Sequence, residues 1–154
     1  MGAAEERLAE LGIELAAPFT PIANFVLAVR TGSLVYLSGH GPILDGKPVY
    51  TGKVASQVSV EDGYQAARLT MLGCLRTLQD ELGSLDRVTR FVKLLGMVNS
   101  DPGFTDQPKV IDGASDLLVE VFGERGRHAR SAVGLASLPL GISVEIELVA
   151  EISE

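Results

Sequence analysis

The feature that most constrains the fold is a pair of short segments around residue 30 that are apolar on both sides. Residues 25–30 read Phe-Val-Leu-Ala-Val-Arg, residues 33–38 read Ser-Leu-Val-Tyr-Leu-Ser, and Thr-Gly separates them. Branched and aromatic residues around a glycine-containing turn predict a β-hairpin. Successive side chains of a strand point to opposite faces, so consecutive apolar residues require burial of both faces. The sheet that contains this hairpin must therefore be covered on two sides.

Two long amphipathic segments predict helices that cover one of those sides. The first begins after Ser59, with Asp62 completing a capping box, and ends at Gly83. The second runs from about residue 106 to residue 122. The apolar stripe of the first comprises Ala67, Met71, Cys74, Leu75, Leu78 and Leu82. The buried side of the second comprises Val110, Ile111, Ala114, Leu117, Leu118 and Val121.

The remaining segments complete the predicted order of elements. Residues 88–98, 131–137 and 143–152 read as strands, residues 3–11 as a helix, and residues 44–54 as a polar loop with room for a short strand. This order suits an α+β sandwich in which two main helices cover one face of a mixed sheet. We expect a single domain over residues 1–154, in which residues 1–23 form the N-terminal helix and an extended connection.

The second face of the sheet has no helix left to cover it. In a single-domain chain of 154 residues, another subunit is the expected cover. The apolar pattern therefore predicts a homo-oligomer, although it does not give the number of subunits.

Charge and cysteine content limit the partners. The chain carries a net charge of −7 and has no basic cluster, whereas nucleic-acid-binding proteins show a basic patch or stripe. It has one cysteine, an acidic N-terminus without an apolar signal core, and no apolar run that approaches the roughly 18 residues of a membrane span. We expect a cytoplasmic protein with neither a membrane nor a nucleic-acid partner.

Several residues that often carry chemistry have simpler interpretations here. His40 and His128 lie far apart in the sequence and lack the spacing of metal ligands, so no metal site is expected. Cys74 falls on an apolar helical stripe, which favours a buried side chain over a nucleophile. Gly39 and Gly41 lack the following helix of a dinucleotide-binding motif. They serve either as a turn at a strand end or as a place where a ligand approaches bare backbone.

Arg130 and Glu145 each have two interpretations. Arg130 at a strand start is either a solvated surface residue or a guanidinium fork that binds a carboxylate through two hydrogen bonds. Glu145 alternates with apolar residues, which by itself explains an exposed side chain. If a partner subunit buries that face, Glu145 needs a polar partner, such as Arg130 of a neighbouring chain or a bound water.

The C-terminal part of the chain resembles a known motif. Residues 130–133, Leu138-Pro139 and the run Val-Glu-Ile-Glu at 144–147 are similar to the C-terminal motif of the YjgF/RidA (L-PSP) family. Residues 36–42 resemble that family's strand ending in Ser-Gly before a proline, and the order of elements agrees over about residues 24–150. The resemblance implies a chorismate-mutase-like fold, a homotrimer with clefts between subunits, and no metal or organic cofactor.

The resemblance also implies an activity and the residues that perform it. Active members of the family are deaminases that hydrolyse reactive imines, formed from enamines, to 2-keto acids and ammonia. In them the motif arginine holds the substrate carboxylate and the first glutamate orients a water; these positions are Arg130 and Glu145 here. The backbone around Gly39 would line the cleft.

Three candidate pocket residues depart from the family pattern and mark a divergent subgroup with an N-terminal extension. Phe25 stands where deaminases carry tyrosine, His40 where glutamine is usual, and Ala132 where cysteine is common. Asp112 replaces an asparagine of the preceding helix. Two alternatives to a deaminase remain: a non-catalytic protein that binds small carboxylates in the same clefts, and an endoribonuclease, which the acidic charge disfavours.

Overall fold

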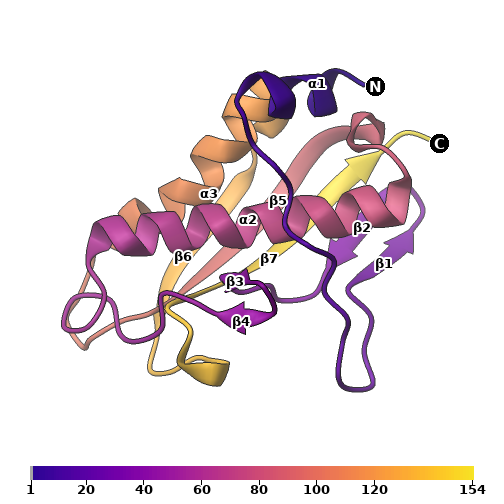
Figure 1. Cartoon of the computed structure of the whole chain (residues 1–154). Coiled ribbons are helices and arrows are strands. Elements are labelled where there is room, and N and C mark those ends of the chain that lie inside the picture. The colour runs from indigo at the N-terminus through magenta and orange to yellow at the C-terminus, as the bar shows by residue number, and fades with distance from the viewer. Residues whose placement is uncertain (1) are drawn as a thin grey trace.

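The structure is a computed structural model that describes residues 2–154, and its centre is a mixed five-stranded sheet with the order β1-β2-β7-β5-β6 (Figure 1). The strands are β1 (Ala28–Thr31), β2 (Leu34–Leu37), β5 (Val88–Asn99), β6 (Ala129–Leu135) and β7 (Val144–Ile152). β5 and β6 are parallel, whereas the other neighbouring pairs are antiparallel. β3 (Ile43–Leu44) and β4 (Lys47–Pro48) form a separate small hairpin within the predicted polar loop.

Two helices, α2 (Val60–Leu82) and α3 (Gln107–Phe122), cover one face of the sheet (Figure 1). The Ser59 hydroxyl accepts a hydrogen bond from the Asp62 amide at 3.0 Å, which confirms the predicted cap, and Gly83 ends the helix at φ 81°. All residues of both predicted apolar stripes are buried. The α+β sandwich is therefore confirmed.

A glycine lets these two helices pack closely. A methyl group at Gly113 of α3 would overlap the carbonyl oxygen of Tyr64 in α2. No side chain larger than hydrogen fits between the helices at that point. The crossing positions the N-terminal half of α3 over β5 and β6, where the candidate site lies.

The opposite face of the sheet is only partly covered by the chain itself. Val29 and Tyr36 on this face remain 55% and 47% exposed. Around Met97, however, residues from the β6–β7 connection, Leu138 and Ile142, fold back and form a second small apolar cluster. The β6–β7 connection therefore buries one end of the second face, which the apolar pattern had left entirely to another subunit.

Two strand boundaries differ from the prediction. The first strand begins at Ala28 rather than Phe25: the backbone pairing with β2 ends with the Ser38 amide donating to the Leu27 carbonyl at 2.9 Å, and the Ser38 hydroxyl donates to the Val26 carbonyl at 2.6 Å. β6 begins at Ala129 rather than residue 131, because its parallel pairing with β5 starts opposite Lys93. Arg130 therefore lies inside the strand.

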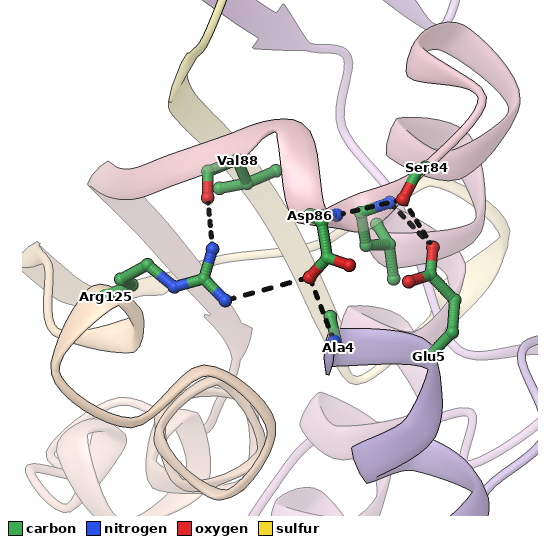
Figure 2. Close-up of polar contacts among 7 residues, drawn as sticks. Ala4, Glu5, Ser84, Asp86, Val88 and Arg125 are labelled. Carbon is green, nitrogen blue, oxygen red and sulfur yellow. Dashed lines mark hydrogen bonds and ion pairs between the residues drawn. The ribbon is translucent and has the colours of Figure 1, made fainter. Parts of the chain in front are cut away.

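The N-terminal helix α1 (Ala3–Glu10) is held by a polar network (Figure 2). The Asp86 carboxylate accepts the Ala4 amide at 3.0 Å and so caps the helix from a distant segment, and it lies 3.9 Å from Arg125. Glu5 of α1 accepts the Ser84 hydroxyl at 3.1 Å. The connection that follows α1 passes in front of α2 in Figure 1 before it reaches β1. None of the helices within residues 2–154 is long and apolar enough to cross a membrane.

Candidate functional site

Arg130 lies at the centre of a polar cluster between β6 and α3, which we call the Arg130 cluster (Arg130, Asp112, Ser115 and His128). Nη1 of Arg130 donates to Asp112 Oδ1 at 2.8 Å and to Ser115 Oγ at 3.1 Å. Asp112 and Ser115 lie three residues apart on α3 and therefore share one face of the helix. The Arg130 side chain is 24% exposed, so the guanidinium is accessible at the surface.

His128 fixes the far side of this cluster. Its Nδ1 lies 2.7 Å from the Gly126 carbonyl oxygen, and its Nε2 lies 2.9 Å from Ser115 Oγ. Burial, reinforced by the positive charge of Arg130, lowers the pKa of His128 and favours the neutral ring. The hydrogen-bond partners of His128 then fix its tautomer. Nδ1–H donates to the Gly126 carbonyl, and Nε2 accepts from the Ser115 hydroxyl, whose oxygen accepts from Arg130.

The geometry leaves one edge of the guanidinium available. Both N–H groups of Nη1 are engaged by Asp112 and Ser115, whereas Nη2 and Nε form no hydrogen bond within residues 2–154. These two atoms present parallel donors on one edge, the arrangement that binds a carboxylate through two hydrogen bonds. The Arg130 cluster can therefore bind a small carboxylate without releasing its internal partners.

Glu145 and Gly39 form a second group at the end of the β1–β2 hairpin, the Glu145 cluster. Tyr36 pairs with Val149 and His40 with Ile146, so β2 carries one extra residue between these pairs and bulges there. A Cβ at Gly39 would lie 2.8 Å from Oε2 of Glu145. Glycine at the bulge thus lets the Glu145 carboxylate approach the backbone closely.

The Glu145 carboxylate is only partly solvated. Partial burial, and secondly the neighbouring Glu147 carboxylate, raise its pKa. A carboxyl group whose pKa is raised exchanges protons more readily near neutral pH, as general acid–base chemistry requires.

Two other predicted site residues lie behind or beside this cluster. His40 is buried: its Nδ1 lies 2.7 Å from the Ser38 carbonyl and its Nε2 lies 2.8 Å from the Thr77 hydroxyl of α2. Both ring nitrogens are therefore engaged within the chain, and the ring anchors the bulge to the helix layer. Phe25 is exposed and directly precedes Val26, whose carbonyl is bonded to Ser38. It thus lies at the same end of the hairpin as Gly39.

Arg130 and Glu145 do not meet within one chain. The Arg130 side chain contacts α3 on the helix-covered face, where Ala132, two residues later, packs against the main core. Glu145 alternates with Val144 and Ile146, which are buried under the helices, and so points to the opposite face. β5 lies between their strands, which separates the two backbones by about two strand spacings, roughly 10 Å. The two clusters are half-sites on opposite faces of the sheet.

Metal-binding side chains, surface depressions and the cysteine bear on what other chemistry these half-sites could use. No group of three or more potential metal-binding side chains occurs in the part of the chain that the structure describes. A shallow depression of about 450 Å³ lies at the start of β6, beside Arg90, Arg127 and His128. Cys74 is fully buried in α2, and burial raises the pKa of its thiol.

Sequence patterns did not identify Ser115 as part of the site and left the role of His128 open. The available signals were weak: Ser115 follows Asp112 by three residues on a helix, and His128 precedes Arg130 by two residues in an extended segment at the start of β6. These spacings put each pair on one face, but only the packing of α3 on β6 brings the two pairs together.

Comparisons with known proteins agree with this fold over almost the whole chain. The family model described as "YjgF/chorismate mutase-like, putative endoribonuclease" matches residues 5–152. Protein TCP17 of Trypanosoma cruzi is 44% identical over 153 residues, covering 99% of this chain and 96% of TCP17.

Two solved structures are similar in both sequence and shape. Atu1372 of Agrobacterium tumefaciens, a protein of unknown function, is 43% identical with a TM-score of 0.91, covering 98% of this chain and 93% of its own. A Shewanella oneidensis MR-1 protein described as a "putative endoribonuclease" has a solved structure that is 35% identical with a TM-score of 0.94, covering 98% of this chain and 100% of its own. Because both align over 98% of this chain, the similarity extends to its N-terminal region.

Proposed function

This chain belongs to the YjgF/chorismate mutase-like family, and from that membership we propose that it is a deaminase that hydrolyses reactive 2-imino acids to 2-keto acids and ammonia. The observation that supports this most directly is the open Nε/Nη2 edge of Arg130, which is anchored by Asp112 and Ser115. An anchored guanidinium edge suits a substrate whose constant feature is a carboxylate.

In the proposed reaction, Arg130 holds the carboxylate and places the adjacent imine carbon next to a water. Glu145 accepts a proton from that water as its oxygen forms a bond to the imine carbon, and it returns this proton to the nitrogen. In the resulting carbinolamine, Glu145 takes the hydroxyl proton and passes it to the nitrogen, the carbon–nitrogen bond breaks, and the carbonyl forms as ammonia leaves. The raised pKa of Glu145 suits a group that both accepts and returns a proton. The route uses no covalent nucleophile, metal or organic cofactor.

This reaction needs two copies of the chain. Arg130 and Glu145 lie on opposite faces of one sheet, so one subunit must supply the first and its neighbour the second. The exposed apolar side chains of the second face, including Val29 and Tyr36, support such an assembly. We therefore propose an oligomer with inter-subunit clefts, a homotrimer by resemblance to the family, in which Phe25, Gly39, His40 and Ala132 line or support the substrate pocket. A single buried cysteine suits the reducing cytoplasm.

The deciding experiment follows keto-acid and ammonia release from 2-imino acids generated in situ by an amino-acid oxidase. Wild-type protein should accelerate release over spontaneous hydrolysis, and Arg130→Ala should lose the acceleration. Arg127→Ala is the matched control, because Arg127 is an exposed arginine paired with Glu124 at 3.0 Å. No acceleration by wild-type protein with any of several 2-imino acids would refute the deaminase.

Two further measurements, thermal stabilisation by 2-keto acids and RNA cleavage, separate the two alternatives. A non-catalytic carboxylate-binding protein would be thermally stabilised by 2-keto acids through Arg130 without turnover. An endoribonuclease would cleave RNA in an Arg130-dependent manner. The charges around the depression beside β6 weigh against RNA, because Arg90 is paired with Glu151 at 2.8 Å and Arg127 with Glu124.

A further inference from the structure

One hydrogen bond connects helix α2 with the backbone that surrounds Glu145. The hydroxyl of Thr77, on α2, lies 2.8 Å from Nε2 of the His40 ring. The backbone of His40 exchanges two hydrogen bonds with Ile146 of β7, both at 2.9 Å. Ile146 directly follows Glu145, so a contact made on the helix reaches the strand that carries the candidate proton-transfer group.

Two successive residues carry this contact from one face of the sheet to the other. His40 pairs with Ile146, whose side chain is buried in the main core, so both side chains lie on the helix-covered face. Gly39 faces the opposite side, where a Cβ on it would lie 2.8 Å from Oε2 of Glu145. Movement of the His40 ring therefore shifts the backbone against which the Glu145 carboxylate packs.

The hydrogen-bond partners of His40 fix its tautomer. The Ser38 carbonyl can only accept, so Nδ1 carries the ring proton and donates it at 2.7 Å. Burial lowers the pKa of His40 and favours the neutral ring, in which Nε2 is an acceptor. The Thr77 hydroxyl is the donor to Nε2. Since Thr77 and His40 are both buried, loss of this hydroxyl leaves Nε2 without a donor.

The same ring also supports the segment that precedes β1. Ser38, whose carbonyl the ring holds, donates its amide to the Leu27 carbonyl at 2.9 Å. Its hydroxyl donates to the Val26 carbonyl at 2.6 Å. Phe25 directly precedes Val26. The Phe25 side and the Glu145 side of the candidate pocket thus share one support.

We propose that Thr77 is a positioning residue for Glu145, which it reaches through His40 from the opposite face of the sheet. This inference rests on the proposed function, in which Glu145 transfers protons. A buried acceptor that loses its donor shifts a local opening equilibrium by about tenfold or more. Without the Thr77 hydroxyl the ring leaves its place more often, and the bulge that holds Glu145 opens with it.

The test removes the hydroxyl and keeps the shape of the side chain. In Thr77→Val, kcat for 2-imino acid hydrolysis should fall about tenfold, because the Glu145 carboxylate is displaced from the reacting water. KM should keep its wild-type value, because Arg130 holds the substrate carboxylate. Thr77→Ser keeps the hydroxyl but loses a buried methyl group, so it should lower the melting temperature and retain wild-type kcat.

Thr70→Val is the matched control on the same helix. Thr70 is fully buried, and its hydroxyl donates at 2.7 Å to the Ala66 carbonyl, a contact within α2 alone. This variant also removes a buried hydroxyl, and it should keep wild-type kcat. Thr77→Ala should reproduce the Thr77→Val result, which covers the case in which valine prevents folding.

Amide hydrogen exchange separates this inference from the proposed function, because it requires no turnover. The amides of His40 and Ile146 donate to each other's carbonyls. Both should exchange about tenfold faster in Thr77→Val than in wild-type protein, and neither should change in Thr77→Ser or Thr70→Val.

Three results would overturn the positioning role: unchanged exchange in Thr77→Val, wild-type kcat in that variant, or an equal loss of kcat in Thr77→Ser. An inactive wild-type protein whose exchange responds as expected would remove the deaminase and leave the link between Thr77 and the bulge intact. An active wild-type protein with any of the three results would remove the positioning role alone.

Discussion

The substitution Gly39→Ala tests whether the backbone bulge exists to position the Glu145 carboxylate. The new Cβ would lie 2.8 Å from Oε2 and 3.0 Å from Cδ of Glu145, whereas ordinary contacts begin at 3.4 Å. The carboxylate must therefore move by about 0.6 Å. Gly39 is not among the residues with positive φ, so alanine fits its backbone conformation.

The expected effects on stability and on activity differ in size. The displaced atoms are the end of a flexible side chain, and alanine also restricts the unfolded chain, which stabilises by roughly 0.4–1 kcal/mol. The free energy of unfolding should thus change by no more than about 1 kcal/mol. A catalytic group displaced by a sizeable fraction of an ångström should lower kcat by roughly 10- to 100-fold.

The assay measures kcat for 2-imino acid hydrolysis alongside urea denaturation of the same preparation. Gly73→Ala is the matched control, since its Cβ would meet only His40 Cδ2 at 3.7 Å in the middle of α2. That variant should gain about 0.5–1 kcal/mol of stability and keep wild-type kcat. A Gly39→Ala enzyme with wild-type kcat would show that Glu145 needs no such placement, and the role assigned to the bulge would be wrong.

Three further predictions concern the scaffold. Gly113→Ala would place a methyl group on a carbonyl oxygen of α2, so urea denaturation should show a loss of roughly 1–3 kcal/mol; an unchanged midpoint would contradict the close helix crossing. Burial lowers the pKa of His40 from 6.5, so the unfolded chain binds more protons and stability should fall as pH drops through 6.5 toward the folded-state pKa. His40→Gln should reduce the pH dependence of the free energy of unfolding to the contribution of His128. An unchanged pH dependence in this variant would contradict the lowered pKa of His40. Asp86→Ala removes the acceptor that caps α1 and should cost about 1 kcal/mol, seen as faster hydrogen exchange over residues 3–10 with α2 unaffected; unchanged exchange in α1 would refute the cap.

Local signals predicted most of the secondary structure. These signals are the Ser59 cap, the Gly83 stop and both apolar stripes. Each depends on residues a few positions apart in one helix, so the sequence pattern alone predicts it. Strand boundaries were less accurate, because they depend on the partner strand. Phe25 lies outside β1 because the backbone pairing with β2 ends at Leu27 and Ser38. Arg130 lies inside β6 because β5 pairs with it from Lys93 onward.

The candidate site likewise has features that the sequence predicts and features that only the tertiary structure shows. Sequence alone pointed to Arg130 and Glu145 as chemically capable residues and to an uncovered sheet face, because residue type and period-two alternation are local properties. Only the tertiary structure placed Arg130 and Glu145 on opposite faces and surrounded the arginine with Asp112, Ser115 and His128. Those contacts depend on how α3 crosses the parallel β5–β6 pair, and no local pattern encodes the packing of two elements against each other.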